Sequence, residues 1–113
     1  MPGTTKKIGP IALTTTLTTN IFNNTSALIY DLIKHIHVSN KTASAATFSL
    51  WLGATGGNAA GTELFTGYSI PAFSAEDFYF PGGLKMLSTD FLVGGAGTTL
   101  ALTITMTSEQ YVV

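Results

Sequence analysis

Residues 28–52 alternate between apolar and polar side chains on either side of a short polar turn. A period of two is typical of a β-strand, in which successive side chains point to opposite faces of the sheet. The turn, residues 40–44, contains an asparagine that tolerates left-handed backbone and several small polar residues, so the pattern predicts a hairpin. Its apolar face needs a second sheet to cover it. The core that we expect between the two sheets comprises Leu28, Tyr30, Leu32, Ile36, Val38, Phe48, Leu50, Leu52, Leu100, Leu102 and Ile104.

The rest of the chain consists of short alternating segments separated by turn residues. Residues 11–21 predict a first long strand, and residues 98–107 predict a late strand that alternates strictly with threonine. No segment has the period of a helix. These features predict an all-β protein, an antiparallel β-sandwich or jelly roll of about eight strands with no substantial helix. We expect residues 1–10 to form an N-terminal extended arm and residues 11–113 to form a single β-sandwich domain.

Charged residues are scarce: they make up 10% of the chain, against 45% hydrophobic residues, whereas about a quarter charged is typical of soluble domains. We therefore expect part of the apolar surface to contact partners. The net charge is −1 and the chain has no arginine, which argues against nucleic-acid binding. The chain has no cysteine, hence no disulfide framework. It has neither a secretory segment nor an apolar run near the roughly 20 residues that span a bilayer, so we expect no membrane association.

Two histidines, His35 and His37, lie two positions apart and therefore on one face of a strand. In a strictly alternating strand, Asp31 shares that face, and such a set could ligate zinc or iron. Asp31 would lie about 13 Å from His35, too far to share one ion. The histidine pair alone could still hold an ion, especially if it is repeated around a symmetry axis. We nevertheless expect histidines that form hydrogen bonds or contact a partner, and no metal. At an interface, protonation of both rings would place like charges together.

The sequence contains no catalytic signature, so we expect a protein that is not an enzyme and has no cofactor. Glu76 and Asp77 are adjacent, which points them apart in an extended segment. The glycine-rich segment 53–61 predicts a loop. Four aromatic residues could form either a platform for sugar or a surface covered by another subunit. The candidate interface residues are Trp51, Tyr68, Phe73, Tyr79, His35 and His37.

The segment Ile36-His37-Val38-Ser39-Asn40-Lys41-Thr42-Ala43-Ser44-Ala45-Ala46-Thr47-Phe48 resembles a hairpin of small virion proteins of tailed bacteriophages. Two later segments are similar as well, residues 84–92 and the strand that begins at Thr98, so that the resemblance covers most of residues 27–108. The chain departs from the family pattern in its threonine-rich first strand, in the loop 53–61 and in its C-terminal residues 109–113.

The resemblance implies a structural protein of the virion, assembled in the host cytoplasm. The first expectation is a capsid decoration (cement) protein, a homotrimer that contacts the major capsid protein or other virion proteins and stabilises the head shell. The alternative is a tail, neck or fibre component with a host-surface or glycan-binding role. Neither function requires nucleic acid or a membrane.

Overall fold

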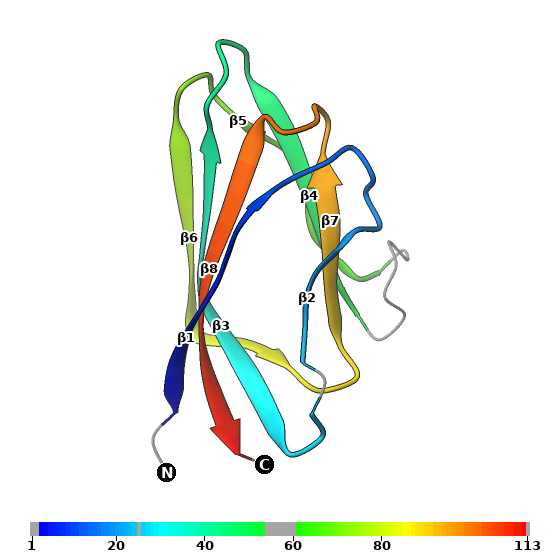
Figure 1. The fold of residues 1–113 in the computed structure, drawn as a ribbon, viewed down its shortest axis with the longest axis vertical. Helices are drawn as coiled ribbons and strands as arrows, with labels where there is room; N and C mark the ends of the chain where they lie inside the picture. The colour runs from blue at the N-terminus through cyan, green and yellow to red at the C-terminus, as the bar shows by residue number, and fades with distance from the viewer. Residues whose placement is uncertain (1–2, 25, 54–60, 113) are drawn as a thin grey trace.

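The computed structural model describes residues 3–24, 26–53 and 61–112, which form eight strands in two four-stranded sheets (Figure 1). The first sheet has the order β1-β8-β3-β6 and the second the order β2-β7-β4-β5. Every pairing is antiparallel and the described residues contain no helix, so the predicted all-β sandwich is confirmed. The strands are β1 (Thr4–Ala12), β2 (Asn20–Asn23), β3 (Ile29–Asn40), β4 (Ala46–Gly53), β5 (Glu63–Ile70), β6 (Ala75–Met86), β7 (Phe91–Ala96) and β8 (Leu102–Val112).

The strand order is that of a jelly roll, in which a long antiparallel hairpin is rolled into two sheets. The pairs β1–β8 and β3–β6 lie in one sheet, and β2–β7 and β4–β5 lie in the other. Three turns meet at one end of the sandwich, those between β3 and β4, β5 and β6, and β7 and β8, at the top of Figure 1.

The hydrophobic core lies between the two sheets and includes much of the predicted set. Ile36, Val38, Phe48, Leu50, Leu102 and Ile104 are each at most 1% exposed, as expected. Leu52 is half-buried and packs against this core.

The core prediction is wrong for the first half of β3 and the residue before it. Leu28 is 73% exposed, while Tyr30 and Leu32 are half-buried and lie outside the core. Asp31 and Ile33 are buried in their place. The cause is a β-bulge, because a strand that gains one residue presents the side chains beyond that residue to the opposite face.

The extra residue of this bulge is Lys34. On β8, the adjacent residues Ser108 and Thr107 pair with Ile33 and His35, so Lys34 has no partner in the register. The residues that point inward are therefore odd-numbered before the bulge and even-numbered after it. The other neighbour of β3 is irregular at the same level, since residues 80–83 of β6 have no partners there. Strand β6 thus runs through Pro81, although proline is rare inside strands.

Two further predictions need correction, that of one strand over residues 11–21 and that of a core position for Leu100. Residues 11–21 are not one strand, because β1 ends at Ala12 and the chain passes to the other sheet before β2. Residues 4–10, which we assigned to an extended arm, are extended and pair with β8 at the edge of the first sheet. Leu100 is not in the core: it precedes β8 in a turn, has a φ of 60° and is 52% exposed.

Candidate functional site

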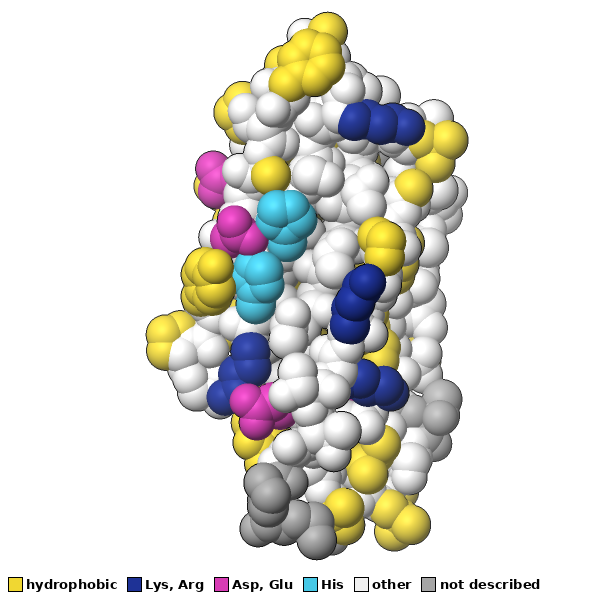
Figure 2. All heavy atoms as spheres, turned by 60° about the vertical axis from the view of Figure 1, so that its left-hand side comes forward, with side chains coloured by type: hydrophobic (Ala, Val, Ile, Leu, Met, Phe, Trp, Pro, Cys, Tyr) yellow, Lys and Arg dark blue, Asp and Glu magenta, His cyan; other side chains and the backbone are white. Residues whose placement is uncertain are grey.

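The outer face of the first sheet carries a cluster of His35, His37 and Asp77. Past the bulge, Ile36 and Val38 point into the core, so His35 and His37 point outward. Strand β6 runs alongside β3 and brings Asp77 opposite His37 and Tyr79 opposite His35. Figure 2 shows the two histidines next to acidic side chains on the surface of the protein. The cluster therefore depends on the pairing of two strands distant in sequence.

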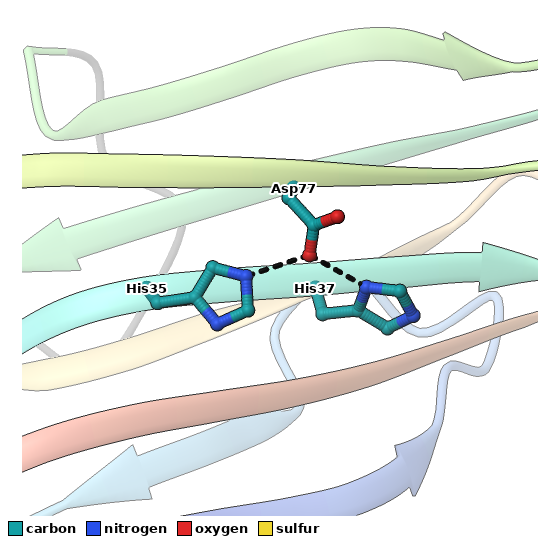
Figure 3. Close-up of side chains that lie close together, drawn as sticks. All are labelled: His35, His37 and Asp77. Carbon is teal, nitrogen blue, oxygen red and sulfur yellow. Dashed lines mark hydrogen bonds and ion pairs between the residues drawn. The ribbon is translucent and has the colours of Figure 1, made fainter.

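A single carboxylate oxygen joins the two histidines (Figure 3). Asp77 Oδ1 lies 2.6 Å from His35 Nε2 and 2.7 Å from His37 Nδ1, and each nitrogen donates to it. The side chains are partly exposed, at 24% for His35, 38% for His37 and 43% for Asp77. The hydrogen bonds from His37 and His35, in that order, lower the pKa of Asp77 below its ordinary value of 3.8. The carboxylate is therefore held in its charged form.

The His35 ring is further fixed by Tyr79, whose ring stacks on it with centroids 4.6 Å apart and planes inclined by 20°. Protonation of the two imidazoles would not leave like charges unopposed, because the Asp77 carboxylate lies between them.

The cluster has the donor set of a metal site. One nitrogen of each histidine and one oxygen of Asp77 lie within 4.8 Å of one another. Two imidazoles and a carboxylate are ligands that zinc and iron accept. Sequence reasoning chose Asp31 as the acidic neighbour, but Asp31 is buried on the opposite side of the sheet. Asp77 was missed because it joins the histidines only through the register of β3 and β6, which the four unpaired residues 80–83 of β6 obscure.

Asp31 is instead a buried carboxyl group with few partners. It is 0% exposed, and its Oδ1 accepts a hydrogen bond of 3.3 Å from Ser108 Oγ. Its Oδ2 has no hydrogen-bond partner of standard geometry among the described residues. Burial raises the pKa of Asp31, and this effect exceeds the opposite influence of Gln110, Ser108 and Lys6.

The four aromatic candidates do not share one surface. Trp51 is 7% exposed, so it cannot belong to an exposed platform for sugar. Tyr68 lies on β5, and it contacts residues of both β5 and β6, which are edge strands of the two sheets. Its ring packs against Phe65 and Phe78, and its hydroxyl donates to Glu76. Tyr79 lies beside the histidines and is 71% exposed.

The fourth aromatic, Phe73, lies in the β5–β6 turn at the end of the sandwich where the three turns meet, and it is 73% exposed. Its amide donates to the Thr42 carbonyl of the β3–β4 turn, and Lys41 of that turn donates to the Ala101 carbonyl, next to Leu100. Phe73 and Leu100 both have a positive φ, of 53° and 60°. Bulky residues rarely adopt this conformation because it costs about 1–2 kcal/mol. Hydrophobic side chains are visible at this end in Figure 2.

Of the predicted loop 53–61, residues 54–60 lie outside the described part of the chain. Within the described part, no helix is long and apolar enough to cross a membrane.

Comparisons with known proteins give little further information. No protein-family model matches the chain, and no curated protein matches it significantly. Two solved structures of infectious bursal disease virus align with it. The Gt strain structure has 9% identity and a TM-score of 0.39 over 95% of this chain and 28% of the matched chain. The Gx strain structure has 8% identity and a TM-score of 0.38 over 96% and 29%. This chain thus spans under a third of the matched chains, and TM-scores this low support no functional inference.

Proposed function

We propose that this chain is a structural protein of a bacteriophage virion, a capsid decoration protein that stabilises the head shell through protein–protein contacts. The sequence resemblance over residues 27–108 supports a structural role in the virion. The jelly roll agrees with it by analogy only, because that architecture serves capsid proteins, lectins and enzymes alike.

The observation that carries a role in assembly is the exposure of large apolar side chains at one end of a chain with little charge. Phe73 and Leu100 are exposed at two turns that both hydrogen-bond to the β3–β4 turn, in a backbone conformation that is costly for side chains of this size. Neither side chain belongs to the core. Exposed apolar side chains that gather at one place typically mark a surface that contacts another protein. Residues held in such costly conformations cluster at functional sites.

The proposed partners are further copies of the chain and the major capsid protein. A homotrimer follows from the resemblance, and closed symmetry is the usual way in which a protein covers an apolar patch. Tyr79 and the histidines extend the candidate surface along the first sheet. Trp51 does not contribute to it, since its side chain is buried. The glycan-binding alternative loses its aromatic platform for the same reason.

The copy number in purified particles tests this function. Quantitative mass spectrometry of purified virions should find a constant number of copies of this chain per copy of the major capsid protein. That number should be of the order of one. A ratio corresponding to the few copies of a neck, tail or fibre component would contradict the decoration role. Absence of the chain from the particles would contradict the virion role altogether.

A further inference from the structure

We propose that His35, His37 and Asp77 bind one divalent transition-metal ion, with zinc as the ion that the ligand set fits best. The site is complete within one chain and does not depend on the function proposed above. Two imidazole nitrogens and one carboxylate oxygen are ligands for Zn²⁺ in proteins, where three protein ligands commonly leave a fourth position open.

The distances are close to those that an ion requires. The three ligand atoms lie within 4.8 Å of one another, and both nitrogens already meet the same oxygen at 2.6 and 2.7 Å. Around a tetrahedral zinc ion with bonds of about 2.0–2.2 Å, ligand atoms lie about 3.3 Å apart. Small side-chain rotations would bring the three atoms to that spacing, without movement of the backbone.

The backbone holds the ligands in place before an ion arrives. His35 and His37 project from the same face of β3 because they lie two residues apart beyond the bulge at Lys34. Asp77 lies directly opposite His37 on a hydrogen-bonded neighbouring strand. The Tyr79 ring, stacked on His35, restricts the rotation of that imidazole. Ligands on rigid paired strands lose little conformational entropy when they bind.

The charges also favour a cation. Within the described residues, the two histidines are the only ion-pair partners of Asp77, so no lysine neutralises its carboxylate. Each ligating nitrogen now carries a proton that it donates to Asp77. In the bound state that proton moves, by exchange with water, to the other nitrogen of the ring, which leaves a lone pair for the ion.

A zinc titration of the full chain at pH 7.5, followed by calorimetry, tests the site. We expect saturable binding of one Zn²⁺ per chain. Asp77→Asn replaces the charged carboxylate oxygen by a neutral amide oxygen, a poorer ligand for zinc, and it should weaken binding about tenfold or more. Glu76→Gln is the matched control, because it also removes one negative charge from β6, at the residue directly before Asp77. The Glu76 carboxylate accepts a hydrogen bond from the Tyr68 hydroxyl. It should leave the affinity unchanged.

A second measurement uses the wild-type chain, so it does not depend on whether a variant folds. The chain has only two histidines, so NMR signals of the imidazole rings report on the site directly. Both rings should shift together and saturate at one equivalent of Zn²⁺. Unshifted rings, the absence of saturable binding or equal weakening by Glu76→Gln and Asp77→Asn would each overturn the site. One ion per several chains would overturn a site within one chain.

Discussion

At the scale of single residues, the least expected feature is a carboxyl group inside the sandwich. Asp31 is buried on the face that the bulge turns inward, where Ser108 Oγ donates a hydrogen bond to its Oδ1. A buried carboxylate is costly unless it is well paired. The raised pKa of Asp31 expresses that cost, since the folded protein holds the proton more tightly than the unfolded chain does.

Asp31→Asn should therefore stabilise the protein at neutral pH by about 1 kcal/mol, because the amide carries no charge to bury. The folded state binds the Asp31 proton above the ordinary pKa of 3.8, so the stability of the wild type falls as the pH rises from there through the raised pKa. Below 3.8 this penalty is absent. Urea unfolding across the pH range should show the advantage of the variant at neutral pH and its loss in acid. An advantage that is independent of pH would contradict the assignment.

Leu102→Ala should cost about 2–5 kcal/mol, because it removes a fully buried side chain and leaves a cavity. Leu100→Ala is its control, two residues away and 52% exposed, and should change the stability by no more than about 0.5 kcal/mol. Urea midpoints measure both. Equal effects would show that the inner face of β8 begins elsewhere.

At the scale of the elements, β3 shows what the sequence can and cannot predict. Its extended character and the inward face of Ile36 and Val38 follow from alternation alone. The inversion before Lys34 does not, because a bulge leaves no signal in a pattern of period two. Because of the same inversion, Asp31 and the two histidines point to opposite faces of β3. The partner that replaces it, Asp77, depends on long-range strand pairing, which local patterns do not encode.

A β3 strand with a bulge at Lys34 should tolerate deletion of this residue, whereas a strictly alternating strand should not. Deleting Lys34 removes the one residue of β3 that has no partner on β8, so both halves of the strand keep their inward faces. The deletion should leave a cooperatively folded protein that is destabilised by less than about 2 kcal/mol.

Deletion of Leu32 is the control for the Lys34 deletion. It removes a paired residue and forces side chains on one side of the gap to the wrong face, so it should cost considerably more. Thermal unfolding followed by circular dichroism compares the two. If the protein without Lys34 fails to fold while the Leu32 deletion is tolerated, the bulge is misplaced.

At the scale of the whole molecule, the jelly roll buries its core completely yet leaves apolar groups outside. Phe73 and Leu100 at one end and Tyr79 on the first sheet are all more than half exposed. With a net charge of −1, the chain has little electrostatic repulsion to keep copies apart. The expectation that follows from both facts is a protein that works only in an assembly.

The end that carries Phe73 should be the contact surface. Phe73→Ser should shift the wild-type oligomer toward monomer by at least tenfold in dissociation constant, since exposed aromatic side chains dominate many interfaces. Leu28→Ser is the matched control, because Leu28 has the same exposed fraction of 73% and precedes β3 at the opposite end of the sandwich (Figure 1). It should leave the association unchanged. Equal weakening by both variants would show that no particular surface is used.

Sedimentation velocity of the wild-type chain at pH 7.5, over a range of concentrations, tests the assembly most directly. The chain mass is 11.8 kDa, and a closed trimer of about 35 kDa is the expected species. A single monomeric species of 11.8 kDa at every concentration would contradict the account.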